Sequence, residues 1–404
     1  MSDLAPDVSA STVPRAMLRP EAAGKEHVID AMRGFAALLV AYFHCRQITW
    51  VGMRSFHHTV GNTFDLNALV AYLTLPVAWG SAGVPIFFVI SGYCIHRGAA
   101  RRLASNRHYR LDAMNFWARR FVRIYPVLIA ALLFTFALDL ISFRLPLINP
   151  RLGNIGLYPF LVNLLSLQGV AGATYGSNGA LWTLSLEVQF YAIYPLLFAL
   201  RRRIGMSSML VIVAGVNVVS AYVLEPRDIQ FFTSYWLSWT LGAWIAEAKA
   251  RSAPGTRSQS RASTVWHYAM AALITALGCI AFNFGQFAAF QLWAIGFATW
   301  LYKALDRPAA NRQPSAPIRL LSRLGDFSFS LYIIHLPLFV LLSSLLYRSA
   351  LQLSIWPSFA FTLVTLPIAY GLYRLVELPA QRWSASIKTH RKSIRRTTRT
   401  RAAR

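Results

Sequence analysis

The chain has 404 residues, of which 56% are hydrophobic and 14% charged, and its formal net charge is +25. A soluble protein of this length would carry about a quarter charged residues, so the composition excludes an ordinary soluble protein and favours an integral membrane protein with many spans. A basic surplus can indicate nucleic-acid binding, but here the basic residues lie in short clusters between apolar segments, which is typical of membrane topology. We therefore expect no nucleic-acid partner.

Apolar segments long enough to cross a bilayer recur along the chain. About 20 apolar residues span the hydrocarbon core, and ten segments approach this length, so we expect an all-α, polytopic protein with about ten transmembrane helices. Shorter apolar stretches at 64–78 and 157–170 are expected to be re-entrant or interfacial. The ten segments are residues 28–48, 79–96, 121–143, 181–200, 206–224, 229–247, 265–283, 286–303, 327–347 and 357–376.

The basic residues predict the orientation of these spans. With the N-terminus in the cytoplasm, 34 of the 40 Lys and Arg residues fall on the cytoplasmic side and six on the outer side. The positive-inside rule therefore predicts that both termini are cytoplasmic. Residues 1–27 then form a polar N-terminal tail without a cleavable signal, 28–383 a transmembrane domain, and 384–404 a basic tail that we expect to be disordered.

The first span carries three ionisable residues that cannot face lipid. Asp30 precedes Arg33 by three residues, and Arg33 and His44 lie on nearly the same helix face, about 16 Å apart along the axis. Ionisable residues inside a membrane indicate a functional site. His44 is a candidate general base near the outer end of the span, and the structural alternative is an interfacial histidine packed at a helix end.

The second and third spans add small residues and arginines. Ser91 lies on a glycine- and serine-rich helix whose small face serves either close helix packing or a narrow substrate arm. Arg119, Arg120 and Arg123 follow at the cytoplasmic mouth of the third span. Three arginines within about one and a half turns grip phosphates through planar bidentate contacts, and the alternative is anchoring by the positive-inside rule.

The later spans contribute the remaining candidates. Glu187 lies inside the fourth span close to Trp182, and it needs a partner, for which Arg33 and His44 are candidates, or a protein-lined aqueous cavity; a structural ion pair is the alternative. Tyr332 and His335 share a face of the ninth span, where Pro337 frees a backbone carbonyl. Cys45, Cys94 and Cys279 show no metal-like spacing, so we interpret them as small apolar residues and predict no metal site.

These motifs together resemble the membrane acyltransferase-3 family. The opening Asp30-x-x-Arg33-Gly34, followed by His44, fits the family pattern D-x-x-R-G…H, and the resemblance covers residues 28–383. Four further blocks match in order: FFVISGY (87–93), RRFVRIYP (119–126), WTLSLEVQFY (182–191) and FSFSLYIIH (327–335). In many relatives a His or another polar residue stands just before the W-[ST]-L block, whereas here Gly179 and Ala180 do.

The resemblance implies a multi-pass enzyme of the bacterial inner (cytoplasmic) membrane. Its members are O-acyltransferases that modify surface polysaccharides such as lipopolysaccharide and exopolysaccharide, Nod factors and some antibiotics. It implies acyl-CoA, usually acetyl-CoA, as a co-substrate bound from the cytoplasm, no permanently bound cofactor, and a glycan or glycolipid acceptor on the outer side. By this resemblance the essential base is His44, its companion is Arg33, and Glu187 is a core-site carboxylate. The CoA phosphates are expected at Arg119, Arg120 and Arg123, and the remaining core-site candidates are Asp30, Ser91, Trp182, Tyr332 and His335.

Two other classes of function fit the composition. A transporter or permease for a lipid-linked sugar or small anion would use the same buried Arg, His and Glu residues as a translocation path, although the sequence shows no internal repeat of the kind common in transporters. A structural membrane scaffold fits the buried polar residues poorly. Within the enzyme class, direct transfer to the sugar and transfer through an acyl-His44 intermediate both remain open. The sequence predicts a chain without the extracytoplasmic domain of some relatives.

Overall fold

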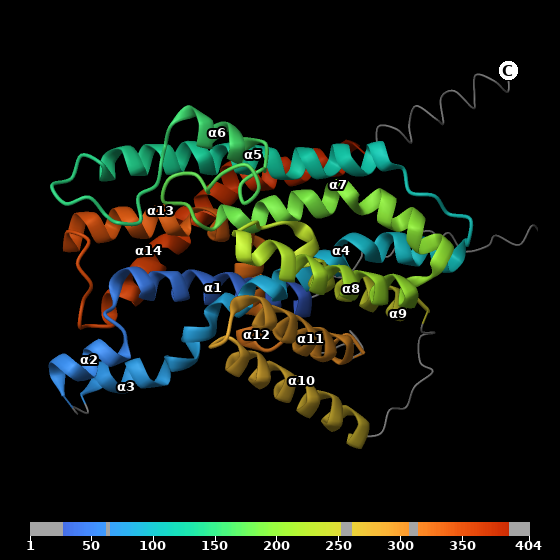
Figure 1. The fold of residues 1–404 in the computed structure, drawn as a ribbon, viewed down its shortest axis with the longest axis horizontal. Helices are drawn as coiled ribbons and strands as arrows, with labels where there is room; N and C mark the ends of the chain where they lie inside the picture. Colours follow the sequence, from blue (N-terminus) through green and yellow to red (C-terminus); the bar gives the residue numbers. More distant parts are fainter. Residues whose placement is uncertain (1–26, 62–64, 252–260, 307–313, 388–404) are drawn as a thin grey trace, which may run out of the picture.

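The computed structural model describes residues 27–61, 65–251, 261–306 and 314–387 (Figure 1). The predicted N-terminal tail, most of the C-terminal tail and residues 252–260 lie outside this part of the chain. In the described residues the structure is helical, with two isolated β-bridges and no strand. The α-helices are α1 (His27–Thr49), α2 (Met53–Val60), α3 (Leu66–Leu73), α4 (Gly83–Ser105), α5 (Ala113–Ser142), α6 (Leu157–Leu164), α7 (Leu181–Ile204), α8 (Met206–Leu224), α9 (Trp236–Arg251), α10 (Arg261–Ala281), α11 (Gln286–Ala304), α12 (Ala316–Asp326), α13 (Ser328–Tyr347) and α14 (Trp356–Leu372).

Short helical turns connect several of these helices. The 3-10 turn η2 (Leu75–Ala82) joins α3 to α4, and η3 (Glu225–Arg227) and η4 (Phe232–Ser234) lie between α8 and α9. The π-turn η5 (Tyr373–Glu377) continues α14 without a break, so that this helical segment extends to Ile387. Pro367 lies inside α14 and Pro337 inside α13, and both helices continue through their proline.

Every one of the ten predicted spans corresponds to a helix. Eight helical segments in the described residues are long and apolar enough to cross a membrane: those containing α1, α4, α5, α7, α8, α10, α13 and α14. The two others do not meet both conditions: α9 has only 16 residues, and α11 is long enough with 19 residues but not apolar enough. The all-helical, polytopic architecture is therefore confirmed, and the number of ten crossings stays a prediction. The two shorter apolar stretches form α3 with η2, and α6.

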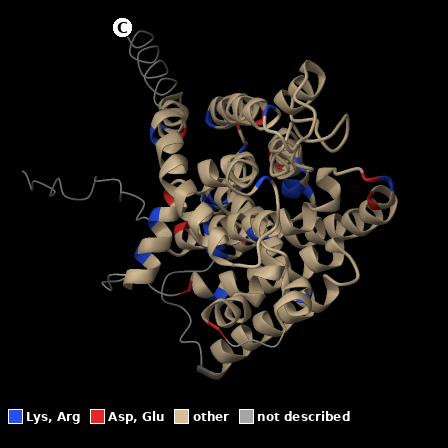
Figure 2. Cartoon of the chain, turned by 90° about the vertical axis from the view of Figure 1, so that its left-hand side faces the viewer, with Lys and Arg blue, Asp and Glu red and all other residues tan. Residues whose placement is uncertain are grey.

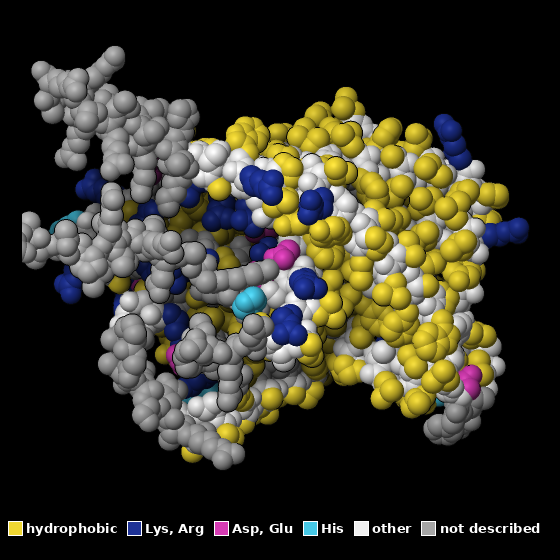
Figure 3. Space-filling view, turned by 180° about the vertical axis from the view of Figure 1, so that it is seen from behind, with side chains coloured by type: hydrophobic (Ala, Val, Ile, Leu, Met, Phe, Trp, Pro, Cys, Tyr) yellow, Lys and Arg dark blue, Asp and Glu magenta, His cyan; other side chains and the backbone are white. Residues whose placement is uncertain are grey.

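The long helices run roughly parallel to one axis and alternate in direction (Figure 1). We call the end at which α4, α7 and α9 finish the basic end, because Lys and Arg side chains gather there while hydrophobic side chains cover most of the remaining surface (Figure 3). The short helices α2 and α3 lie at the opposite end. Viewed from that end, basic positions appear near the centre of the projection as well as at its edge (Figure 2). Glu247 and Glu377 are buried, so charged residues lie inside the bundle.

Helix α13 is the most enclosed of the eight apolar spans. Within its most apolar window 78% of the residues are buried, against 11% in α10. It packs against α1, α5 and α14. The short helix α12 lies along α1 and leads directly into α13. Both segments therefore contact the first span. The interior of the bundle therefore lies around α13, with α1 packed against it.

Two glycines set the close contact between α1 and α12. A Cβ atom on Gly325 would lie 1.9 Å from the carbonyl oxygen of Asp30, and one on Gly34 would lie 2.1 Å from that of Leu321. Neither distance is possible for a real side chain, so the two backbones touch only because both residues lack one. The glycine that follows Arg33 in the opening motif thus has a packing role, and it fixes where the first half of α1 lies.

A buried ionic cluster ties α4, α7 and α9 together at the basic end. Glu247 is 4% exposed and forms an ion pair with Arg201 of α7. Its carboxylate also contacts Nε2 of His96 at 2.9 Å and Arg251 at 2.8 Å. A buried carboxylate needs such partners, because leaving it unpaired is costly. The cluster holds the short helix α9 against the two longer helices that enclose the site.

Candidate functional site

A cavity of about 140 Å³ lies between α1, α4, α5, α7 and α13. Its lining has two kinds of side chain. Basic, acidic and hydroxyl side chains make up the polar part of the lining, and aromatic and aliphatic side chains make up the apolar part. The polar lining residues are Arg33, Ser91, Cys94, Arg120, Arg123, Thr183, Glu187, Tyr191, Ser328 and Tyr332. A cavity that combines several charges with an apolar wall suits a ligand that has a charged head and a narrow apolar arm.

Three arginines from two helices line the polar part of the cavity. Arg33 comes from the first half of α1, and Arg120 and Arg123 come from successive turns of α5. The Arg120 guanidinium lies over the Tyr191 ring, 5.3 Å from its centroid, which holds it beside α7. Arg119 does not line the cavity, since its Nε donates to the carbonyl oxygen of Asn115 on its own helix at 3.2 Å.

Glu187 is bonded to hydroxyl groups. Its carboxylate accepts a hydrogen bond from Ser91 Oγ at 3.3 Å and another from the Tyr191 hydroxyl one turn further along α7. The two partners proposed from the sequence were Arg33 and His44. Arg33 lines the same cavity, and His44 is not among the lining residues. The carboxylate therefore adds a negative charge to a cavity wall that is otherwise basic.

A second carboxylate, Glu377, lies behind the arginines and was not among the predicted site residues. It is 1% exposed and belongs to the π-turn η5. Its carboxylate accepts hydrogen bonds from the backbone N–H of Ser330 at 3.1 Å and from the Ser330 hydroxyl at 2.6 Å. It is close enough to Arg33 and Arg123 for their charges to interact. The predicted span 357–376 ends just before Glu377, and the continuation of α14 through the π-turn buries this residue inside the bundle.

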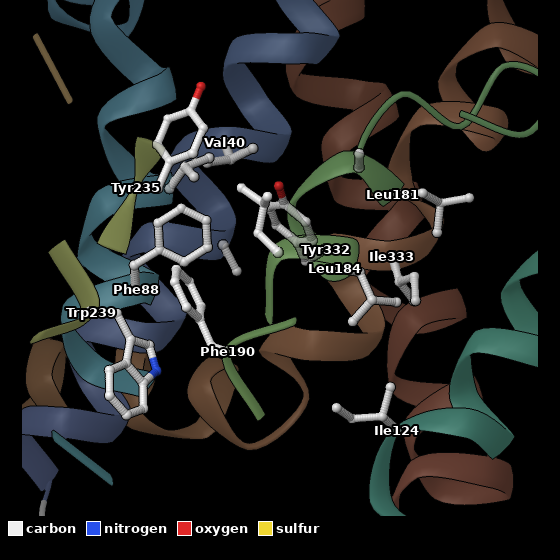
Figure 4. Close-up of a cluster of buried hydrophobic side chains, with 14 of the residues drawn as sticks. Val40, Phe88, Ile124, Leu181, Leu184, Phe190, Tyr235, Trp239, Tyr332 and Ile333 are labelled. Atoms are coloured by element: carbon white, nitrogen blue, oxygen red, sulfur yellow. The ribbon is translucent and has the colours of Figure 1, made fainter. Parts of the chain in front are cut away.

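The apolar part of the cavity ends at Tyr332. Phe88, Leu184 and Ile333 form its wall, and the close-up shows them with Tyr332 among the surrounding aromatic side chains (Figure 4). The hydroxyls of Tyr332 and Thr183 are hydrogen-bonded at 2.8 Å. The Tyr332 ring also packs edge-on against the His335 ring, with centroids 5.8 Å apart. Tyr332 thus separates the arginine cavity from the histidines beyond it.

His44 and His335 form a hydrogen-bonded pair across α1 and α13. Nδ1 of His44 lies 2.8 Å from Nε2 of His335, and the two rings are nearly parallel, with an interplanar angle of 7°. His335 is fully buried, whereas His44 is partly exposed. The two residues are 291 positions apart in the sequence. The fold therefore joins the predicted base to a predicted core-site residue from the most buried helix.

The hydrogen-bond partners fix the tautomers of the two neutral rings. Nδ1 of His335 lies 2.8 Å from the carbonyl oxygen of Tyr332, and a carbonyl only accepts, so this nitrogen carries the hydrogen. Nε2 of His335 then has a lone pair and accepts from Nδ1–H of His44. Nε2 of His44 is consequently the unprotonated nitrogen, which is the form that a general base requires.

The other predicted residues fall in different places. Ser91 and Tyr332 line the cavity, as described above. Asp30 lies in the first turn of α1, where its backbone touches α12. Trp182 is absent from the cavity lining and packs against Tyr235 and Phe290, with ring centroids 5.5 and 6.3 Å away. Two polar residues that the sequence did not single out, Asn178 and Arg151, contact the helices that carry the histidine pair.

The apolar helices and the ionisable site that they enclose define a multi-pass membrane protein. A family model described as "Acyltransferase domain" matches residues 26–374. The chain belongs to this family, the membrane acyltransferase-3 family, as the sequence motifs predicted. The match includes the helices that carry His44, the cavity arginines, Glu187 and His335.

Comparison with curated relatives also finds acyltransferases. The chain is 29% identical over 231 residues to Acyltransferase MdmB of Streptomyces mycarofaciens, covering 56% of this chain and 49% of the relative. It is 24% identical over 345 residues to Peptidoglycan O-acetyltransferase OatA of Listeria monocytogenes, covering 78% and 54%. It is 25% identical over 216 residues to Nodulation protein 10 of Rhizobium leguminosarum bv. viciae, covering 50% and 52%. The chain thus spans about half the length of these relatives. No solved structure shows a significant match to it.

Proposed function

We propose that this protein is a membrane-embedded O-acyltransferase that moves an acetyl group from acetyl-CoA to a sugar hydroxyl of a surface or secreted glycan. One observation carries the proposal: the hydrogen-bond chain from the Tyr332 carbonyl through His335 leaves Nε2 of His44 free to act as a base. Acyl transfer to an alcohol requires such a base, because the attacking hydroxyl must lose its proton. The family of the chain supports the same chemistry.

The proposal includes the orientation of the protein. The basic end faces the cytoplasm and all ten apolar segments cross the membrane, as the split of 34 and six basic residues predicts. Both termini are then cytoplasmic, and the opposite end, with α2 and α3, faces outward. In a bacterium this is the inner membrane. Acetyl-CoA would enter from the basic end and the glycan from the other.

The arginine cavity is the proposed donor site. Arg33, Arg120 and Arg123 supply planar guanidinium groups that suit the phosphates of CoA. The apolar part of the cavity suits the narrow arm that ends in the thioester. In the structure this arm would stop at Tyr332, so transfer requires the Tyr332 ring to move and its hydrogen bond to Thr183 to break.

The proposed reaction takes place at His44. Nε2 of His44 takes the proton of the sugar hydroxyl while the hydroxyl oxygen attacks the thioester carbonyl carbon. The carbonyl electron pair moves to oxygen, and the tetrahedral oxyanion then collapses, breaking the C–S bond. The CoA thiolate leaves and takes the proton from His44. Throughout, the bond from Nδ1–H of His44 to His335 holds the ring in place.

A second route passes the acetyl group to His44 before it reaches the sugar. Mass spectrometry of protein incubated with acetyl-CoA alone distinguishes the two routes, because only the second leaves a trapped acetyl group on His44.

The name of the Listeria relative supports a glycan acceptor and an acetyl donor. The Listeria relative is described as a peptidoglycan O-acetyltransferase, and the Streptomyces relative as an acyltransferase. Neither name specifies the sugar or the hydroxyl that this chain would use. The proposal therefore commits to the class of reaction and to the class of acceptor.

The test uses the purified full-length protein in lipid nanodiscs. The substrates are acetyl-CoA labelled in its acetyl group and surface glycan extracted from cells that lack the protein. We expect label in the glycan with the wild type and none with His44→Ala, whereas His58→Ala, a change at an exposed histidine of α2, transfers normally. Absence of transfer by the wild type, together with CoA-independent flux of a glycan precursor in liposomes, would instead support a transporter.

A further inference from the structure

The reaction at His44 needs a group that stabilises the oxyanion. Attack on the thioester moves the carbonyl electron pair onto oxygen, and a fixed donor aimed at this oxygen contributes strongly to catalysis. The three arginines of the cavity lie beyond Tyr332, away from the histidine pair. His44 is partly exposed but does not line that cavity, so its exposed edge opens on another side.

Arg151 is a cation near the outer end of α1. It lies on the loop between α5 and α6, and its guanidinium donates to the carbonyl oxygen of Gln47 at 3.0 Å. Gln47 follows His44 by three residues, so Arg151 lies over the last turns of α1. Its positive charge is also close enough to act electrostatically on the His44 ring. Partial desolvation lowers the pKa of the Arg151 guanidinium, but arginine stays charged in proteins.

The loop that carries Arg151 is fixed to both helices of the histidine pair. Asn149 is 4% exposed, and its amide donates to the Ser344 hydroxyl of α13 at 3.3 Å. Its side-chain oxygen accepts from the backbone N–H of Arg151 at 3.0 Å. The Tyr175 hydroxyl bonds the carbonyl of Ile155 at 2.9 Å further along the loop. The position of Arg151 is therefore set by the same two helices that position His44 and His335.

Arg46, the neighbouring arginine at this end, binds other groups. Arg46 of α1 donates to the carbonyl oxygen of Thr74 at 2.6 Å, and its guanidinium lies over the Trp50 ring at 4.4 Å. For Arg151 the structure records one acceptor for its guanidinium, the Gln47 carbonyl, out of five N–H groups. Donors therefore remain for a ligand next to His44.

We infer that Arg151 stabilises the oxyanion of the tetrahedral intermediate that forms at His44. This inference rests on the proposed function. As the hydroxyl oxygen bonds to the carbonyl carbon, the former carbonyl oxygen gains the negative charge and accepts hydrogen bonds from the guanidinium. When the C–S bond breaks and the thiolate leaves, the charge moves away from Arg151. The residue would then bind the transition state more strongly than either substrate.

The test compares Arg151→Gln and Arg151→Lys with Arg144→Gln, a matched change at an exposed arginine of the same loop. The substrates are acetyl-CoA and the extracted surface glycan used above, and size-exclusion chromatography measures how much of each variant is folded. We expect Arg151→Gln to lower kcat about 10²- to 10³-fold with the KM values for both substrates nearly unchanged. Arg151→Lys, which keeps the charge, should recover part of this loss, and Arg144→Gln should match the wild type.

The outcomes separate the inference from the proposed function. An active wild type with no loss in Arg151→Gln overturns the inference alone. A loss confined to the KM for the glycan does the same, because it would make Arg151 an acceptor-binding residue. Equal losses in Arg151→Gln and Arg144→Gln also overturn it, since they would reflect the general charge of the loop. A wild type that transfers no acetyl group overturns the proposed function together with the inference.

Discussion

The side-chain amide of Asn178 donates a hydrogen bond of 2.8 Å to the carbonyl oxygen of Ile333 in the middle of α13. Pro337, four residues further on, has no N–H to offer this carbonyl. The freed carbonyl is therefore satisfied by a residue from the loop before α7. The same amide also donates to the Thr135 hydroxyl of α5 at 3.0 Å. One buried side chain thus joins the helix that carries His335 to two neighbours.

The hydrogen bond from Asn178 predicts that shortening this one side chain destabilises the protein. Asn178→Ala leaves a backbone carbonyl unbonded inside the bundle, which should cost about 1–3 kcal/mol of stability. Pro337→Ala restores an N–H at that position, so the double variant Asn178→Ala/Pro337→Ala should lose less than Asn178→Ala alone. Thermal unfolding of the purified variants in one detergent measures both. Strict additivity of the two changes would contradict the proposed link between them.

The cavity arginines give a prediction about the donor. Arg120→Gln and Arg123→Gln each remove one cation from the cavity wall, and a hydrogen bond to a charged group is worth about 1.5–3 kcal/mol. We expect the KM for acetyl-CoA to rise about 10- to 100-fold in each variant, with a much smaller change in kcat. Steady-state rates over a range of acetyl-CoA concentrations measure the two parameters separately.

Arg119→Gln is the matched control for these two variants. Arg119 is on the same turn of α5, but its side chain bonds to its own helix and lies outside the cavity lining. Its replacement should leave the KM for acetyl-CoA within about twofold of the wild type, since no lost contact is expected. If all three variants weakened acetyl-CoA equally, the general positive charge of this end would explain the result and the cavity would not be the donor site.

The sequence predicted the fold well because membrane helices leave strong local signals. Long apolar segments and alternating basic clusters located a helix for each of the ten segments. The boundaries were less predictable. The predicted span 357–376 stops just before Glu377, whereas in the structure the helix continues through the π-turn and brings this carboxylate into the bundle. Such a turn has no clear sequence signal, because it depends on the packing around it.

The residues of the site were more predictable from the sequence than the contacts between them. Helical spacing placed Tyr332 and His335 on one face, but the bond between His335 and His44 joins two helices whose contact the sequence does not show. Helical spacing also grouped Arg119 with the other two arginines, although it bonds to its own helix. The loop residues Asn178 and Arg151 were missed, because the role of a loop residue depends on which helices its side chain contacts in the folded protein.

Gly325 gives a prediction about packing between α1 and α12. A Cβ atom there would lie 1.9 Å from the carbonyl oxygen of Asp30, so Gly325→Ala must push the two helices apart. Overpacking of this kind typically costs about 1–3 kcal/mol, and backbone atoms yield less readily than side chains. Gly215→Ala in α8 is the control, because a Cβ there has no neighbour within 4 Å. Melting temperatures in detergent should fall for Gly325→Ala and stay level for Gly215→Ala, and equal values would argue against the contact.

His335 should act on the reaction through the orientation of His44. His335→Leu removes the acceptor for Nδ1–H of His44, so the ring is free to turn and to change tautomer. We expect kcat to fall by at least about 10-fold, up to the roughly 10²- to 10⁴-fold contribution of a general base. The KM for acetyl-CoA should be nearly unchanged, because His335 does not line the donor cavity.

The choice of replacement separates orientation from simple packing. In His335→Gln the side-chain oxygen lies near the position of the lost Nε2 and accepts from His44, while His335→Leu fills the space without an acceptor. If His335 orients the base, the Gln variant keeps more kcat than the Leu variant at similar folded yield. If His335 only fills the core, the more apolar Leu variant should be the more active of the two, because leucine suits a fully buried position better than an amide does. Rates of both variants, normalised to the folded fraction from size-exclusion chromatography, decide between these roles.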